Sequence, residues 1–172
     1  MVESLAELDS LLLPPSWVVK APLSASGRAR YIERNGPALV DSKARRTVER
    51  LFENHGPLLF EPWMDRTADF GVSALLGPEL KIVGIHGQKV DIKGQFTEID
   101  LKPDLSLQDR DRLLETTEAV ALALRNAGYV GLFGIDAWKY RTDGGTALNP
   151  LGEVNARMTF GLVAWARQGR LS

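Results

Sequence analysis

The chain has 172 residues. It contains 21 Lys and Arg and 22 Asp and Glu, which gives a formal net charge of −1. A charge this close to zero does not support binding to nucleic acid or to a membrane surface. Cysteine is absent and histidine occurs twice, which excludes disulfides, thiolate metal sites and a histidine-rich zinc site. No apolar run approaches the ~20 residues that span a bilayer, and Glu3, Glu7 and Asp9 stand where a signal peptide would carry positive charge. The sequence therefore predicts a cytoplasmic protein that binds neither nucleic acid nor a membrane.

The first third of the chain shows a short helix, then strands around a loop, then a long helix. The helix is stopped by Pro14 and Pro15, because proline cannot continue it. Strands are predicted at 16–21, 29–33 and 58–64, and a helix with apolar residues at helical spacing is predicted over 38–54.

The remaining elements are a strand meander, a second long helix, a hairpin and a last helix. They are predicted at 68–77, 80–88, 94–101, 106–127, 129–141, 147–157 and 158–168. Strands and helices do not alternate strictly, so the sequence predicts an α+β fold with antiparallel sheets and helices packed on one side. Two lobes are expected, one of residues 1–62 with the first helix and a phosphate loop, and one of residues 63–172 with a metal site.

The segment "LGEVNAR" places Glu153, Asn155 and Arg157 at two-residue spacing. In a strand these side chains share one face. The row is either a solvated outer face or a site for metal and phosphate, and the spacing alone favours the solvated face.

Asp136 stands in the apolar segment "GLFGIDAW", which is expected to pair with the Glu153 strand across Asp143-Gly144-Gly145. A carboxylate in such a strand is costly unless something pairs with it. Asp136, Glu153 and the Asn155 carbonyl oxygen suit the demand of Mg²⁺ for hard oxygen ligands. The alternative is a plain ion pair of Asp136 with Arg157 or Lys139.

Two further segments could bind a nucleotide. Lys20 and the Ser/Gly loop of "KAPLSASGRAR" could contact phosphate oxygens through a charge and backbone N–H groups, although the segment also reads as a hairpin turn. In "LLFEPWMDR", a strand enters a proline-containing connector whose backbone could bind an adenine edge. Taken alone, the segment favours the alternative that Phe60 and Trp63 are core residues.

Together, these segments stand in the order found in ATP-grasp proteins. The chain resembles the central and C-terminal part of that fold from about Ser16 to Trp165, and "EVNAR" is the most specific piece. The resemblance implies a carboxylate–amine ligase-like protein with ATP and Mg²⁺, or Mn²⁺, as cofactors and a small-molecule carboxylate as substrate.

The resemblance also implies roles for individual residues. Lys20 would contact the α- and β-phosphates, and Arg157 would stabilise the transferring phosphoryl group, so both are candidate catalytic residues. The other nucleotide-binding candidates are the loop residues Ser24, Ser26, Gly27 and Arg28, the hinge residues Glu61, Trp63 and Met64, and Asp69 near the ribose. The metal ligands would be Asp136, Glu153 and Asn155, with Glu153 bridging if two ions bind.

The chain departs from the family pattern ahead of Lys20. Family members usually carry an N-terminal substrate-side domain and a further phosphate-contacting lysine, and only nineteen residues precede Lys20 here. Two functions are therefore expected as alternatives. One is an ATP-dependent ligase unit, and the other is a nucleotide-binding module or fragment that needs another chain or domain for turnover.

Overall fold

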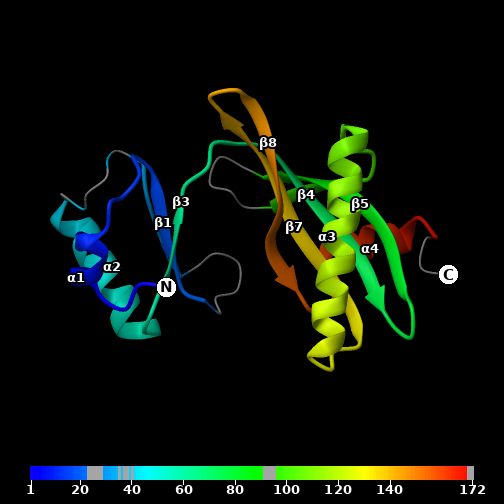
Figure 1. The fold of residues 1–172 in the computed structure, drawn as a ribbon, viewed down its shortest axis with the longest axis horizontal. Helices are drawn as coiled ribbons and strands as arrows, with labels where there is room; N and C mark the ends of the chain where they lie inside the picture. The colour runs from blue at the N-terminus through cyan, green and yellow to red at the C-terminus, as the bar shows by residue number, and fades with distance from the viewer. Residues whose placement is uncertain (23–28, 35, 37–38, 40, 91–95, 170–172) are drawn as a thin grey trace. The chain divides into compact units, whose positions relative to one another are not determined.

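The computed structural model describes residues 1–22, 29–34, 36, 39, 41–90 and 96–169, which form two compact units, Met1–Met64 and Asp65–Ser172. Each unit contains one antiparallel sheet, so the predicted α+β class is confirmed (Figure 1). The predicted order of helices and strands is also confirmed. The predicted lobes 1–62 and 63–172 stay a prediction, because compactness does not test what each lobe does. None of the helices in the described ranges combines the length and apolar character needed to cross a bilayer.

A three-stranded sheet with the order β2-β1-β3 forms the first unit. Its elements are α1 (Leu5–Ser10), β1 (Trp17–Lys20), β2 (Arg30–Glu33), α2 (Ser42–His55) and β3 (Leu59–Pro62). Trp17 and Val19 alternate onto one face of β1, where both are fully buried against residues of α1 and α2. The expected placement of helices on one side of the sheet therefore holds in this unit.

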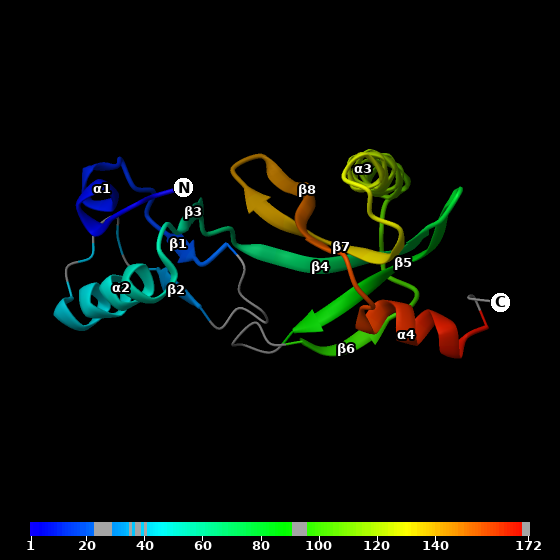
Figure 2. The ribbon, with the colours of Figure 1, turned by 90° about the horizontal axis from the view of Figure 1, so that it is seen from below.

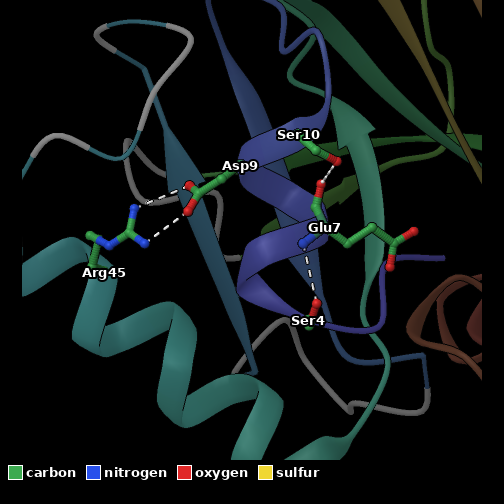
Figure 3. Close-up of polar contacts among 5 residues, drawn as sticks. All are labelled: Ser4, Glu7, Asp9, Ser10 and Arg45. Carbon is green, nitrogen blue, oxygen red and sulfur yellow. Dashed lines mark hydrogen bonds and ion pairs between the residues drawn. The ribbon is translucent and has the colours of Figure 1, made fainter.

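An ion pair also joins α1 to α2. Arg45 donates from both Nη atoms to the Asp9 carboxylate, at 3.1 and 2.8 Å (Figure 3). Ser4 caps α1 by accepting the Glu7 N–H, and Ser10 Oγ donates to the Glu7 carbonyl. Both side chains of the Arg45–Asp9 pair are more than a third exposed, so solvent screens the pair and the buried core holds the helices together.

The second unit is built on a five-stranded sheet with the order β6-β5-β4-β7-β8. Its elements are β4 (Arg66–Leu76), β5 (Leu80–Val90), β6 (Phe96–Asp100), α3 (Leu107–Asn126), β7 (Gly131–Thr142), β8 (Gly145–Asn155) and α4 (Phe160–Arg167). Ser106 caps α3 by accepting the Asp109 N–H, and Gly128, with φ of 79°, follows its end. The sequence signals for this helix therefore marked its true ends.

The two helices of the second unit cover opposite faces of the sheet, which corrects for this unit the expectation of helices on one side (Figure 2). Phe70 and Val72 of β4 pack in one cluster with residues of α3. Gly71 lies between them in the strand and faces the other way, toward His86, which contacts Gly161 of α4. A strand that is covered on both faces reads as a continuous apolar run, so its sequence does not show where each helix packs.

Candidate functional site

Asp136 of β7 and Glu153 of β8 lie directly opposite each other in adjacent antiparallel strands. The predicted pairing of these two strands is confirmed. Residues opposite each other project their side chains to the same face, with Cβ atoms about 4.5–5.5 Å apart. Asn155, two residues beyond Glu153, shares this face and opposes Gly134. The strand pairing therefore brings the three predicted metal ligands together.

Two amide groups hold the Asp136 carboxylate. Gln88 Nε2 donates to Asp136 Oδ1 at 2.8 Å, and Asn155 Nδ2 donates to Asp136 Oδ2 at 3.0 Å. Within the described part of the chain, no ion pair joins Asp136 to Arg157 or to Lys139. The plain ion pair considered as the alternative for Asp136 is therefore wrong.

Lys139 points to the other face of β7, because it follows Asp136 by an odd number of residues. There its Nζ lies 2.6 Å from Oδ2 of Asp109 on α3. The hydrogen bond from Lys139, with a second one from Ser106, holds the pKa of the Asp109 carboxyl below its usual value. This ion pair fastens α3 to the sheet on the side away from Asp136.

Arg157 lies beyond the strand, so the predicted row of three residues is wrong in its last member. Strand β8 ends at Asn155, and the Arg157 backbone N–H donates to the Asn155 carbonyl at 2.8 Å in a tight turn. The side chain nevertheless returns to the site, because Arg157 Nη2 donates to Asn155 Oδ1 at 2.9 Å. A turn, and not strand alternation, brings Arg157 to this face.

A bulge in β8 lies next to Glu153. Trp138 opposes Asn149 and Asp136 opposes Glu153, so residues 150–152 stand opposite the single residue Ala137 and β8 carries two extra residues. A Cβ on Gly152 would lie 1.7 Å from Trp138 Cζ3, which means that the indole packs where only glycine fits. Arg66 covers the Trp138 ring, with its guanidinium carbon 3.8 Å from the ring centroid.

Asp69, the predicted ribose contact, is engaged with the same arginine. Arg66 Nη1 donates to Asp69 Oδ1 at 3.0 Å, and the Asp69 side chain is 14% exposed. Asp69 opposes Trp138 in the register of β4 and β7, so it lies on the same face as Asp136. Its predicted role in nucleotide binding stays a prediction.

In the first unit, two predicted nucleotide-binding residues pair with each other. Lys20 Nζ lies 2.8 Å from each carboxylate oxygen of Glu61. The Lys20 and Glu61 side chains are 31% and 43% exposed, so both remain accessible and the pair itself adds little stability.

The other connector residues are partly buried. The Trp63 N–H donates to the Ser16 carbonyl at 2.9 Å, and the Arg34 guanidinium lies 5.2 Å from the centroid of the Trp63 ring. Phe60 packs against the core of the first unit, whereas Trp63 is not part of that cluster and Met64 is half-buried. The core interpretation therefore holds for Phe60 and not for Trp63. The predicted loop residues Ser24, Ser26, Gly27 and Arg28 lie outside the described residues.

The oxygens of Asp136, Glu153 and Asn155 fit Mg²⁺ in chemical type, since this ion prefers hard oxygen ligands and commonly takes one or two carboxylates from the protein. Over the ranges that the structure describes, no group of three or more His, Cys, Asp or Glu side chains could hold a metal ion. The candidate set consists instead of two carboxylates and one amide oxygen. Substrate phosphates and water would complete such a shell.

Gln88 and His86 were not singled out as site residues from the sequence. Both lie on β5 at two-residue spacing, so they share one face of a strand that is otherwise mostly apolar. This polar pair was the sequence signal that could have indicated their place in the site. His86 is 2% exposed, and burial lowers its pKa to about 4, so its ring is neutral at pH 7. Its Nδ1 meets no hydrogen-bond partner among the described residues.

Neither a family model nor a curated protein sequence matches the chain, whereas many solved structures do. The biotin carboxylase of Campylobacter jejuni, solved as a β,γ-ATP complex, matches with a TM-score of 0.67 and 18% identity over 88% of this chain and 33% of its own. The biotin carboxylase domain of the Hydrogenobacter thermophilus 2-oxoglutarate carboxylase was solved with MgADP and bicarbonate. It matches with a TM-score of 0.68 and 16% identity over 93% of this chain and 35% of its own. The N5-carboxyaminoimidazole synthetase of Staphylococcus aureus, solved with ADP, matches with a TM-score of 0.62 and 12% identity over 86% of this chain and 36% of its own.

These neighbours are ATP-grasp ligases. The chain has the ATP-grasp fold. The resemblance expected from the order of the sequence segments is thereby confirmed at the level of the fold. The chain spans about a third of the length of these three proteins.

Proposed function

We propose that the chain is an ATP- and Mg²⁺-binding unit of an ATP-dependent ligase, which activates a small carboxylate as an acylphosphate for attack by an amine or a similar nucleophile. The observation that carries the proposal is the convergence of Asp136, Glu153 and Asn155 on one face of an ATP-grasp sheet. Neighbours of this fold were solved with ADP and with MgADP, which supports a nucleotide as the ligand. A cytoplasmic location is part of the proposal.

Asp136, Glu153 and the Asn155 amide oxygen are proposed to hold Mg²⁺, with Mn²⁺ as an acceptable substitute. When bound, the ion would neutralise charge on the phosphate oxygens. Arg157 starts next to Asn155, and its planar fork suits phosphate oxygens that the ion leaves uncovered. Two carboxylates and a neutral amide limit the repulsion between ligands before the ion binds.

The remaining proposed contacts are with the nucleotide. Lys20 is assigned to the α- and β-phosphates, where its flexible stem can carry a point charge. The loop of Ser24, Ser26, Gly27 and Arg28 is assigned to the phosphates, Glu61, Trp63 and Met64 to adenine, and Asp69 to the ribose.

In the proposed reaction, a carboxylate oxygen of the substrate attacks the γ-phosphorus of ATP. The bond from this phosphorus to the β,γ-bridging oxygen breaks, and ADP leaves with the electron pair. A nucleophile then attacks the acyl carbon and displaces phosphate. Catalysis of the first step rests on positioning and charge stabilisation, which Lys20 and Arg157 supply as donors to phosphate oxygens.

A second candidate is a nucleotide-binding module without turnover of its own, completed by another chain or domain. It is favoured by the share of the neighbours' length that this chain spans, about a third. In that case, the nucleotide contacts are as proposed above and the substrate carboxylate is bound elsewhere.

Isothermal titration calorimetry of ATP, with and without Mg²⁺, tests the common part of both proposals, and a screen of carboxylates and amines for ADP release separates them. Asp136→Asn should lose the Mg²⁺-dependent part of the affinity, while Asp111→Asn, an exposed change on α3, should keep it. ADP release with a carboxylate supports the ligase, and binding without release in the whole screen supports the module. Absence of ATP binding by the wild-type chain overturns both.

A further inference from the structure

Gln88 reaches Asp136 across an intervening strand. Gln88 is on β5 and Asp136 is on β7, and β4 lies between these strands. Strands two positions apart are about 9–10 Å apart, which is too far for most pairs of side chains to meet above a side chain of the middle strand. The hydrogen bond of 2.8 Å therefore requires a residue on β4 whose side chain does not stand between Gln88 and Asp136.

Gly71 is that residue, because glycine has no side chain. In the register of the sheet, Gly71 opposes Asp136 on one side and His86 on the other. A Cβ at Gly71 would lie 2.8 Å from Gln88 Nε2 and 2.3 Å from His86 Nε2, so these two side chains fill the space above the glycine. The missing side chain at Gly71 opens the path from Gln88 to Asp136.

The bond from Gln88 completes the orientation of the Asp136 carboxylate. Gln88 holds Oδ1 and Asn155 holds Oδ2, so neither oxygen can turn without breaking a bond. Both donors are neutral amides, and each carboxylate oxygen keeps a further lone pair for another ligand. A lysine in place of Gln88 would orient the group equally well but would compete with a cation for its charge.

We propose that Gln88 is a positioning residue for the metal ligand Asp136, acting through this hydrogen bond above Gly71; the proposal rests on the proposed Mg·ATP function. Hydrogen bonds to ligating carboxylates fix ligand orientation, and their loss typically costs 10–100-fold in metal affinity. Mg²⁺ is sensitive to such a loss because it demands near-ideal octahedral geometry.

The test is calorimetry of a non-hydrolysable ATP analogue on the full chain over a Mg²⁺ series, with thermal unfolding of the metal-free protein measured in parallel. Gln88→Met keeps the length of the side chain and removes the donor, and Gln108→Met is the matched control at an exposed position of α3. We expect Gln88→Met to weaken the Mg²⁺-dependent part of the affinity about 10–100-fold. Its affinity without Mg²⁺ and its unfolding temperature should match those of Gln108→Met.

Gln88→Asn is the second variant, because it retains an amide but is one methylene too short to span Gly71 with the same geometry. It should show the same loss, and it keeps the test decisive if Gln88→Met does not fold. An unchanged Mg²⁺ dependence in a folded Gln88 variant overturns the positioning role alone. A wild-type chain without any Mg²⁺-dependent affinity overturns the proposed function, and the role of Gln88 with it.

Discussion

Arg157 Nη2 lies 2.9 Å from Asn155 Oδ1, so the guanidinium donates to the amide oxygen that is the proposed metal ligand. The Asn155 Nδ2 group donates to Asp136 at the same time, so the amide cannot rotate without breaking this hydrogen bond. Asn155 Oδ1 keeps a second lone pair, but the positive charge of Arg157 on this oxygen opposes a cation there, so we expect Arg157 to move away when the metal ion binds. Arg157 occupies the ligand atom in this structure and would turn to phosphate when the nucleotide binds.

Arg157→Gln tests this exchange. Removal of the guanidinium frees Asn155 Oδ1 and removes a positive charge near Asp136, so the affinity for Mn²⁺ without nucleotide should rise or stay equal. The affinity for Mg·ATP should fall, because a phosphate contact is lost. Mn²⁺ binding followed by electron paramagnetic resonance and ATP calorimetry measure the two effects. A fall in both affinities would show that Arg157 supports the metal site and does not compete with it.

Glu153→Gln should abolish the Mg²⁺-dependent part of the nucleotide affinity. The same change should leave the metal-free protein equally or slightly more stable, since it relieves repulsion with Asp136 across the strand pair. Thermal unfolding and calorimetry give the two readouts, and Glu118→Gln on an exposed turn of α3 is the matched control. If Glu153→Gln unfolds the metal-free protein and keeps the Mg²⁺ dependence, its carboxylate is structural.

Lys20→Ala should weaken ATP binding by roughly 1.5–3 kcal/mol, the usual size for a hydrogen bond to a charged group. The ion pair with Glu61 is partly exposed, so its loss should change stability little. Calorimetry measures the ATP affinity of Lys20→Ala and of the control Lys102→Ala, which removes an exposed lysine of the second unit. The comparison separates the loss of the Lys20 contact from the loss of any positive charge. Equal ATP affinities of the two variants would remove Lys20 from the site.

The free energy of unfolding should rise with pH between about 4 and 6.5 because of His86. Burial lowers the pKa of His86 from 6.5 to about 4 in the folded protein, so in this window the unfolded chain binds a proton that the folded protein does not. At about 1.36 kcal/mol per pH unit, the contribution of His86 is on the order of 3 kcal/mol. It is fully present above pH 6.5 and is lost as the pH falls to about 4.

Urea unfolding across this pH range measures the effect in the wild type, in His86→Gln and in His55→Gln, which changes the exposed histidine of α2. His86→Gln should lose this part of the pH dependence, and His55→Gln should keep it. Parallel curves for the two variants would show that His86 is not the group responsible.

Gly161→Ala should destabilise the second unit by about 1–3 kcal/mol, the usual cost of overpacking. The new Cβ would lie 2.0 Å from His86 Cε1, so α4 would have to move away from the sheet. Gly144→Ala is the control, because a Cβ there meets no atom within 4 Å. Equal unfolding temperatures for both variants would mean that α4 packs less closely on β5 than the structure indicates.

The sequence by itself determined the type and order of the elements, because these follow from local pattern. Apolar residues at helical spacing, a serine cap and a glycine stop located α3, and two-residue alternation located the strands. The pairing of the Asp136 strand with the Glu153 strand was also predictable, since a two-residue turn at Asp143-Gly144 joins them. The residue opposite Asp136 was not, because the turn register alone would place Leu151 there and the bulge at 150–152 shifts the pairing by two residues to Glu153.

Only the tertiary structure decided which side chains from distant strands meet. The bond from Gln88 to Asp136 depends on β4 lying between their strands and on Gly71 standing at the crossing, and no local period encodes either fact. The face of the sheet that α4 covers could not be predicted either, because a strand that is buried on both sides has apolar residues on both faces and its sequence does not distinguish them. Arg157 left the predicted row because the chain turns directly after Asn155, and a turn of this kind is set by the contacts of the folded site and not by residue spacing.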